Sequence, residues 1–475
     1  MTARRQGDHV MTMRRTMVGL ALGWTLAVSA AVGSAQGLPQ GKAPGRPQGQ
    51  SEATPHGLSK ASPEAVGLAP ERLARLTTAM QAYVDEGRLS GTVTLVARNG
   101  KVVYLEAAGK RDVESNVPMT TDTLFRIASM SKAVTSVAVM MLIEEGRIHL
   151  DDPVSRFIPA FTRTTVMVPP PPGTAAAAIA TTAGTAPAAR PITIRHLLTH
   201  TAGISYGKGN PFESDYQSAG AIGWYFADKD EPIAATIDRL AKLPMDAQPG
   251  EKYVYGFNTD ILGVVVEKVS GLSLDEFFRS RIFQPLKMTQ TAFYVEPTAK
   301  DRLATVYAIA KAGGRLERAP EPLMGQGNYV VGPRKSYSGG AGLVSTASDY
   351  VRLLQMLLNG GALDGARLLS PKTVELMTSN HVGTLYSNGT LGFGLGFEVT
   401  EHVGRSGRPG SVGEFGWGGA YHTKYWVDPV EKLVVVFMTQ LLPATGSDAH
   451  MTLRQLVYAS IVDAPDARVA LRPAS

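Results

Sequence analysis

The chain has 475 residues, of which 44% are hydrophobic and 19% charged, a composition that fits a globular protein and excludes a largely disordered one. Its formal net charge is +6, but no basic run is longer than a pair of arginines, so we expect no nucleic-acid partner. The absence of cysteine excludes disulfides, a cysteine nucleophile and thiolate metal ligands.

Residues 1–35 have the features of a cleaved signal peptide. Arg14–Arg15 precede an uncharged, mostly apolar run over 17–32, and the small residues at 33–35 offer a cleavage site. The run is short for a membrane span, which needs about 20 apolar residues, so an uncleaved anchor is the weaker alternative. We therefore expect an exported protein, periplasmic or secreted, with no stable membrane span after cleavage.

The rest of the chain is predicted to form a tether and one domain. Residues 36–64 are rich in Gly, Pro, Gln and Ser, which is typical of a disordered tether, and a single domain follows over 65–465. Strand signals at both ends of this domain and helical signals between them predict an α/β (α+β) fold, one sheet with an inserted helical lobe. The predicted boundaries are about 65–120 and 300–465 for the sheet lobe, about 121–299 for the helical lobe, and 168–191 for an exposed low-complexity insertion.

Periodicity and turn residues predict the main elements in chain order. Pro70 begins a first helix, and Asn99–Gly100 is a strong turn signal between two strands of a hairpin. The remaining signals predict strands at Thr92–Ala97 and Val102–Ala107, a short helix within 192–198, helices at Asp260–Val269, Ser273–Phe283 and Ala347–Leu358, a hairpin of Tyr421–Val427 and Lys432–Thr439, and a last helix near Met451–Val462.

The stretch Phe125–Lys132 is predicted to be a turn that runs into a central helix. Residues 133–143 are apolar on nearly every side, which is typical of a helix buried in the core, and Gly146 is a plausible left-handed end of that helix. Ser129 and Lys132 are three residues apart and would share one face at the start of the helix. The sequence therefore places a hydroxyl and an amine together at the positive end of a rigid element.

This pair has the chemistry of an activated nucleophile. An alkyl hydroxyl attacks poorly until a base removes its proton, and a lysine can be that base in its neutral form, which burial and a helix N-terminus both favour. Ser131 is the rival nucleophile, but it is adjacent to Lys132, and adjacent helical residues do not face each other. A Ser-x-x-Lys spacing also occurs by chance, so the buried helix behind it carries much of the prediction.

Two further stretches could complete such a site. Tyr255, within 249–258, has a phenol that could shuttle protons near a lysine, although Tyr253 is almost as good a candidate and either could simply pack on the next helix. The glycine-rich stretch Gly416–Ala420 is predicted to run into a strand. Glycines there would let a substrate lie along the strand edge and let a backbone N–H donate to an oxyanion, the alternative being a tight turn.

Two other patterns are predicted to be coincidental. Ser205 in Gly203–Gly207 matches the Gly-x-Ser-x-Gly nucleophile elbow, which needs a buried strand before it and a helix after it, whereas a helical segment precedes it here. His196 and His200 are spaced like a helical zinc pair, but position 197 is leucine instead of glutamate and no third ligand is evident. We therefore expect neither an elbow nor a metal site.

Taken together, these stretches resemble the serine β-lactamase and penicillin-binding-protein superfamily, and they are most similar to its class C β-lactamase-like branch, which includes the family VIII carboxylesterases. The resemblance covers about residues 65–440 and implies a mainly antiparallel sheet flanked by helices, with the site between the sheet and the helical lobe. It rests on phrases that follow the family's order, namely Phe125–Lys132, Ile192–Gly203, Leu243–Gly250, Tyr255–Gly263, Gly339–Asp349, Gly392–Phe397 and Gly416–Pro429.

The resemblance also implies roles for single residues. Ser129 would form the acyl-enzyme, Lys132 would be its base, and Tyr255 would relay protons to and from the leaving group. The backbone N–H groups of Ser129 and Ala420 would form the oxyanion hole. The stretch Trp417, Gly418, Gly419 stands where the lactamases carry Lys-Thr-Gly, and no metal or cofactor is implied.

Two departures from the family pattern bear on the substrate. Trp417 replaces a lysine that could hold the carboxylate of a β-lactam, and Phe257 stands where the second motif, Tyr-x-Asn, has asparagine. Both changes resemble the esterase-like members. We therefore predict a serine hydrolase that cleaves a small-molecule carboxylic ester, or less readily an amide. The alternatives are a β-lactamase or D-Ala-D-Ala carboxypeptidase with the same residues, and a non-catalytic binding protein on this fold.

Overall fold

The computed structural model describes residues 57–168, 183–309, 311, 313–320 and 325–463. The predicted signal peptide, most of the predicted tether and residues 169–182 of the predicted insertion lie outside the described residues.

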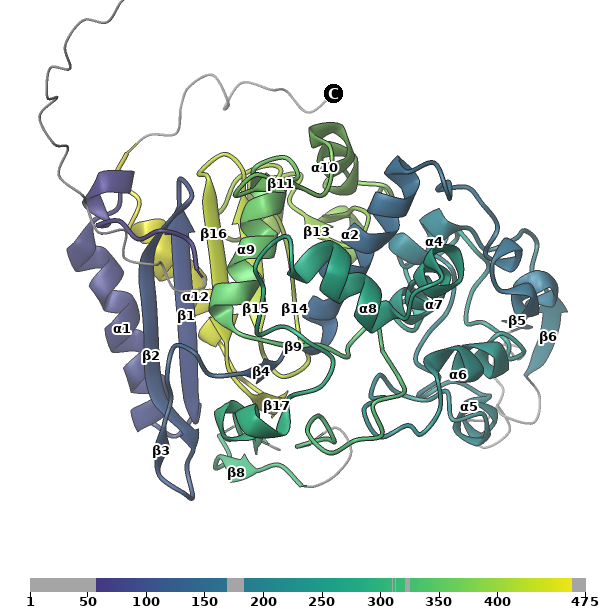
Figure 1. Ribbon diagram of the computed structural model, residues 1–475, viewed down its shortest axis with the longest axis horizontal. Coiled ribbons are helices and arrows are strands. Elements are labelled where there is room, and N and C mark those ends of the chain that lie inside the picture. Colours follow the sequence, from purple (N-terminus) through teal and green to yellow (C-terminus); the bar gives the residue numbers. More distant parts are fainter. Residues whose placement is uncertain (1–56, 169–182, 310, 312, 321–324, 464–475) are drawn as a thin grey trace, which may run out of the picture. The chain divides into compact units, whose positions relative to one another are not determined.

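An antiparallel sheet of eight strands is the centre of the fold, with the order β12-β13-β14-β15-β16-β1-β2-β3 (Figure 1). β1 pairs with β2 across the predicted Asn99–Gly100 turn and with β16 near the other end of the chain, so the prediction of one sheet built from both chain ends is confirmed. The strands are β1 (Gly91–Arg98), β2 (Lys101–Asp112), β3 (Val117–Pro118), β12 (Gly392–Phe393), β13 (Glu398–Val399), β14 (Phe415–Gly418), β15 (Lys424–Asp428) and β16 (Leu433–Met438).

Helices cover both faces of this sheet. α1 (Pro70–Asp85) and α12 (Ala449–Ala459) pack on one face, and α9 (Ala347–Leu358) packs on the other (Figure 1). Because successive side chains of a strand point to opposite faces, Val435 packs in the core with α1 and α12, whereas its neighbour Val436 packs in the core with α9. The central strands are therefore buried on both faces.

The predicted buried helix is α2 (Ser131–Glu144), and its residues 131–142 are all buried. It ends before Gly146, which has the predicted left-handed conformation at φ 68°. Ser129 does not belong to this helix, because it lies in a 3₁₀ turn, Ala128–Met130, that immediately precedes it. The nucleophile candidate therefore projects from a turn, and Lys132 projects from the first turn of α2.

The helical lobe and several short strand pairs complete the fold. The lobe contains α4 (Ile194–Leu198), α5 (Glu213–Ser218), α6 (Ile233–Leu240), α7 (Asn258–Ser270) and α8 (Leu274–Phe278), and α7 packs directly on α2. Two short helices lie outside it, α10 (Pro371–Met377) and α11 (Val403–Ser406). The short strands are β4 (Phe125–Arg126) with β9 (Val344–Ser345), β5 (Thr165–Val168) with β6 (Gly184–Pro187), β10 (Ala362–Leu363) with β11 (Ala366–Arg367), and β7 (Tyr307–Ile309) with β8 (Glu317–Arg318) and β17 (Leu441–Ala444).

Two predicted elements differ in detail. The glycine-rich stretch was expected to precede a strand, but Gly418 ends β14 and a turn follows, in which the Gly419 N–H bonds to the Thr423 carbonyl at 2.9 Å, so β15 begins only at Lys424. The helix predicted over 273–283 is interrupted, because α8 ends at Phe278 and a π turn continues the chain.

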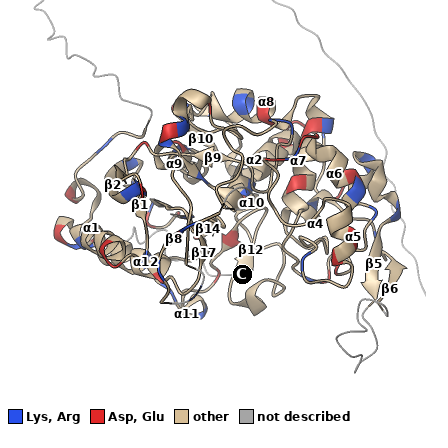
Figure 2. Cartoon of the chain, turned by 90° about the horizontal axis from the view of Figure 1, so that it is seen from below, with Lys and Arg blue, Asp and Glu red and all other residues tan. Residues whose placement is uncertain are grey.

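The surface of the domain carries mixed charge. Figure 2 shows lysine and arginine interspersed with aspartate and glutamate over the helices. None of the helices in the described part of the chain is both long and apolar enough to cross a membrane.

A stacked pair of buried histidines beside the sheet predicts that the folded state loses stability in acid. The rings of His422 and His450 are 3.9 Å apart and nearly parallel, and His450 donates to the His422 carbonyl. Burial lowers the pKa of His450 to about 4 and that of His422 to about 3. As the pH falls below about 6.5, the unfolded chain takes up these protons first. Each histidine then lowers the free energy of unfolding by up to about 1.4 kcal/mol per pH unit.

Replacing one ring should therefore flatten the pH dependence of stability. His450→Gln is expected to lose less unfolding free energy than the wild type between pH 6.5 and 4.5 in urea titrations. His402→Gln, at an exposed histidine, is the matched control and should follow the wild-type curve. Parallel curves for the wild type and His450→Gln would contradict the prediction.

Candidate active site

The structure brings Ser129 and Lys132 together at the start of α2. The Lys132 side chain is 2% exposed, and its amine donates a hydrogen bond to Ser129 Oγ at 3.2 Å. The preceding residue, Ala128, is buried with φ 39°, a left-handed conformation that non-glycine residues rarely adopt and that clusters at functional sites. This backbone bend orients the serine hydroxyl toward the amine.

Two other oxygen atoms hold the Lys132 amine. It donates to the Tyr206 hydroxyl at 3.2 Å and to the Gly340 carbonyl at 2.8 Å. Asp260 holds the turn at Gly340, because its Oδ1 accepts a hydrogen bond from the Gly340 N–H at 3.0 Å. A Cβ at position 340 would lie 2.5 Å from that carboxyl group, so the turn requires glycine. Burial raises the pKa of Asp260, and the charge of Lys132 opposes this rise.

Tyr255 lies on the other side of the amine. The centroid of its ring is 4.7 Å from Lys132 Nζ, and its hydroxyl accepts a hydrogen bond from Trp417 Nε1 at 3.2 Å. The rival Tyr253 packs its ring against Tyr386, and its buried hydroxyl has no partner among the described residues. The structure therefore places Tyr255 and not Tyr253 beside Lys132.

Tyr206 is the site residue that sequence reasoning missed. It follows the coincidental Ser205 in a loop without periodicity, and no sequence signal connects it with Lys132, which is 74 positions earlier. Burial raises the pKa of its phenol well above the usual range, so the hydroxyl stays neutral.

The glycine-rich end of β14 lies against the Ser129 turn. A Cβ at Gly419 would meet the Ile127 carbonyl oxygen at 2.3 Å, so only glycine allows this approach. The Ala420 N–H that follows donates to no group among the described residues. β15 pairs with β14 as far as Gly418, whereas β13 pairs with its other edge only as far as Gly416. Among the described strands, the β13-side edge of β14 is therefore open at Trp417 and Gly418, and this edge and an N–H donor lie beside Ser129.

Aromatic side chains form the wall of the site around Trp417. Its ring centroid is 5.6 Å from Tyr255, 5.3 Å from Phe393 and 6.2 Å from Tyr386. His200 packs on Tyr255 with a centroid separation of 4.7 Å. Burial and the nearby charge of Lys132 lower the pKa of His200 well below its usual value, so this ring is neutral. The wall therefore presents aromatic rings at the position where the family pattern would place a lysine.

The two coincidental patterns have structural roles. Ser205 Oγ accepts from the Gly207 N–H at 3.1 Å, and neither a strand before it nor a helix directly after it forms an elbow. His196 Nδ1 accepts from the Thr193 N–H at 3.2 Å in a helix cap, and His200 Nδ1 accepts from Asn258 at 2.9 Å. Within the described ranges, no three His, Asp or Glu side chains are grouped as metal ligands would be.

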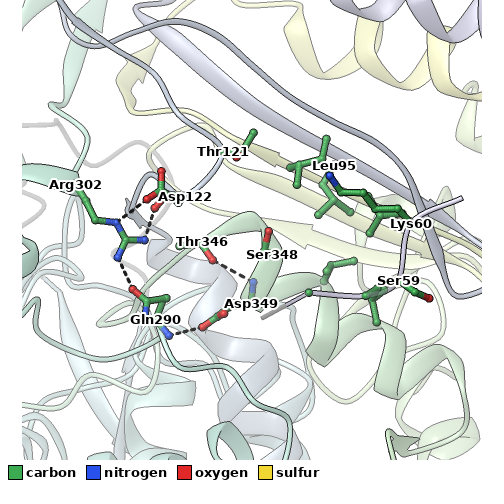
Figure 3. A pocket seen from close by; sticks show the side chains of 15 residues that line it. Ser59, Lys60, Leu95, Thr121, Asp122, Gln290, Arg302, Thr346, Ser348 and Asp349 are labelled. Carbon is green, nitrogen blue, oxygen red and sulfur yellow. Dashed lines mark hydrogen bonds and ion pairs between the residues drawn. The ribbon is translucent and has the colours of Figure 1, made fainter. Parts of the chain in front are cut away.

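A separate cavity of about 680 Å³ lies between β1, β2 and the start of α9 (Figure 3). Its walls are mainly apolar, and at one end Arg302 pairs with Asp122 and bonds to Gln290. None of Ser129, Lys132, Tyr206 or Tyr255 lines it. It is therefore distinct from the candidate active site.

Comparison with known proteins shows the family of the chain. A family model described as beta-lactamase matches residues 76–460. The chain belongs to the β-lactamase family. Protein Rv1367c of Mycobacterium tuberculosis (strain ATCC 25618 / H37Rv) is 36% identical over 385 residues, which cover 78% of this chain and 90% of that protein. Esterase EstB of Burkholderia gladioli is 30% identical over 409 residues, which cover 81% of this chain and 95% of that protein.

Among solved structures, EstCE1, described as a hydrolase with promiscuous acyltransferase activity, superposes with a TM-score of 0.69 and 31% identity. The match covers 82% of this chain and 99% of EstCE1. The family and the fold predicted from the sequence are thus confirmed. The chain is a serine hydrolase of the β-lactamase family.

The site geometry predicts which serine reacts. Ser129→Ala should abolish covalent labelling by a fluorophosphonate probe, because its hydroxyl is the one bonded to the buried amine. Ser205→Ala should label like the wild type, because Ser205 only bonds within its own loop. Intact-mass spectrometry of the labelled protein measures the labelling of both variants. If Ser205→Ala fails to label and Ser129→Ala still labels, the assignment is reversed.

Lys132→Ala should also lose labelling, because it removes the amine that bonds to Ser129, while its thermal unfolding stays cooperative.

Proposed function

We propose that the protein hydrolyses carboxylic esters of small molecules through an acyl-enzyme on Ser129, with Lys132 as the base and Tyr255 as the proton relay. The observation that carries the proposal is the bond from Trp417 Nε1 to the Tyr255 hydroxyl at 3.2 Å. It shows an uncharged donor at the position where a lactamase would have an ammonium group. A neutral ester needs no counter-ion there, whereas the carboxylate of a β-lactam does.

The first half of the reaction follows from the hydrogen bonds. Lys132 takes the proton of Ser129, and Ser129 Oγ bonds to the ester carbonyl carbon. The resulting oxyanion accepts from the N–H groups of Ser129 and Ala420, which are fixed before the reaction begins. As the ester C–O bond breaks, Tyr255 gives a proton to the departing alcohol oxygen and is re-protonated from Lys132.

The second half repeats these steps with water. Water attacks the acyl carbon as its proton passes to Tyr255, whose own proton passes to the neutral Lys132 amine. The bond from the acyl carbon to Ser129 Oγ then breaks, and Ser129 Oγ takes the proton back from Lys132, which releases the carboxylic acid. Because Tyr255 accepts from Trp417, its own proton is directed away from the indole and toward the reacting groups. The indole therefore orients the Tyr255 hydroxyl for proton transfer.

Ester turnover should exceed β-lactam turnover. We expect kcat/KM for p-nitrophenyl butyrate to exceed that for a chromogenic cephalosporin by at least about 100-fold, the scale of one or two lost charge-assisted bonds. Spectrophotometric assays of one purified sample, with Ser129→Ala as the blank, measure both. Efficient cephalosporin turnover with negligible ester cleavage would favour a β-lactamase or D-Ala-D-Ala carboxypeptidase. Absence of both turnover and probe labelling would favour a binding protein.

Removing the hydroxyl of Tyr255 should lower kcat far more than removing that of Tyr253. Tyr255→Phe is expected to lower kcat for p-nitrophenyl butyrate by about 10²- to 10⁴-fold, the usual contribution of a positioned acid–base group. Tyr253→Phe removes a hydroxyl without a partner and should stay within about twofold of the wild type. Equal losses in the two variants would contradict the assignment of the relay.

Acyl transfer to an alcohol is a second activity that the aromatic wall favours. Trp417, Phe393 and Tyr386 surround the acyl-enzyme position with apolar surface, which would concentrate an apolar alcohol next to Ser129 relative to bulk solvent. The description of EstCE1 as a hydrolase with promiscuous acyltransferase activity is consistent with this. Butyl ester formation from vinyl butyrate and butanol, measured by gas chromatography, would distinguish transfer from hydrolysis.

A further inference from the structure

We propose that Tyr206 positions the catalytic base by accepting a hydrogen bond from the Lys132 amine. The inference rests on the proposed role of Lys132 and goes beyond it, because it assigns a function to a residue outside the family motifs quoted above. It follows from a count of the hydrogen bonds that the amine can make in each of its protonation states.

A neutral amine has two N–H bonds and one lone pair. The Gly340 carbonyl can only accept, so it takes one N–H of Lys132 at 2.8 Å. The lone pair must face Ser129 for the serine proton to be removed. The second N–H then needs an acceptor, and the Tyr206 oxygen provides it at 3.2 Å. With both N–H bonds fixed, the lone pair has one direction left, which is toward Ser129 Oγ.

The same partners suit the protonated amine. After Lys132 accepts the serine proton, it has three N–H bonds, directed to the Gly340 carbonyl, Tyr206 and Ser129. The amine therefore need not rotate while it takes the serine proton, which avoids a cost of reorganisation at that step. A neutral phenol also serves better than a carboxylate, which would hold the amine permanently in its charged form.

The packing around Phe257 holds this phenol in place. Phe257 is completely buried, and its ring meets the Tyr206 ring edge-on at a centroid distance of 5.0 Å. The ring at position 257 therefore supports the phenol that bonds to the Lys132 amine.

The test uses the rate of fluorophosphonate labelling, which needs the base but no ester. In this reaction Ser129 Oγ bonds to phosphorus, fluoride leaves, and the serine proton passes to Lys132. Tyr206→Phe, which removes one oxygen atom, should slow labelling by about 10- to 100-fold, the worth of a hydrogen bond to a charged group. Tyr253→Phe is the matched control and should label within about twofold of the wild type.

The pH profile separates positioning from a general loss of structure. The ammonium form of Lys132 loses more from the missing acceptor than the neutral form, so the acidic limb of the rate–pH profile should move to lower pH in Tyr206→Phe. The other titratable groups facing the amine, Asp260, Tyr255 and His200, are unchanged in this variant. A packing defect would lower the rate without moving the limb.

A variant at Phe257 tests the support of the phenol. Phe257→Leu keeps the Tyr206 hydroxyl but removes the aromatic ring that packs on it, so it should slow labelling less than Tyr206→Phe and move the acidic limb less, in the same direction. Labelling of Tyr206→Phe at the wild-type rate with an unmoved profile would overturn the proposal.

Turnover of p-nitrophenyl butyrate, measured on the same samples, tells the two proposals apart. If the wild type reacts with the probe but does not turn over esters, the proposed ester hydrolysis is wrong, while the labelling rates still decide the role of Tyr206. If the wild type does both and Tyr206→Phe matches it in both, only the role of Tyr206 is wrong.

Discussion

The buried amine of Lys132 is the group on which the rest of the site depends. It is surrounded by oxygen atoms from three different parts of the chain, the turn before α2, the loop at Tyr206 and the turn at Gly340. An amine without such partners would be costly to bury, because it would lose its hydration. The fold therefore has to bring a helix, a loop of the helical lobe and a turn before β9 to one point.

The scaffold around this point is rigid for separate physical reasons. α2 is buried over its first 12 residues, so it cannot shift without breaking the core that it shares with α7. Gly340 and Gly419 sit where a side chain would collide with Asp260 and with the Ile127 carbonyl. These contacts fix the base and the glycine-rich strand end independently of each other, which is how a preorganised site is built from distant segments.

Much of the fold and part of the site could be predicted from the sequence because their signals are local. The Asn99–Gly100 turn, the uniformly apolar α2 and the three-residue spacing of Ser129 and Lys132 each depend on neighbouring residues alone. Ser129 lies in a 3₁₀ turn and not in the predicted helix because Ala128 has a left-handed backbone conformation. An alanine in the sequence gives no indication of such a conformation. Tyr206 reaches Lys132 only through the packing of the lobe, so no local pattern could reveal it.

The aromatic replacements at 257 and 417 are related in the structure, although they are 160 positions apart. Trp417 bonds to Tyr255, Tyr255 packs against Tyr206 at 5.8 Å, and Tyr206 packs on Phe257. One apolar, ring-lined surface therefore runs from the strand edge to the base. The sequence showed two departures from a motif, whereas the structure shows a single continuous change in the character of the site.

The pairing of β1 with β16 has a consequence for the order in which the protein is built. Val93 lies opposite Met438, so the middle of the sheet joins residues that leave the ribosome 345 positions apart. Such distant partners are slow to meet, and the nascent chain must wait for its last strands before the sheet can close. Ala420 is made with those strands, so the strand end beside Ser129 is the last part of the site to take its place.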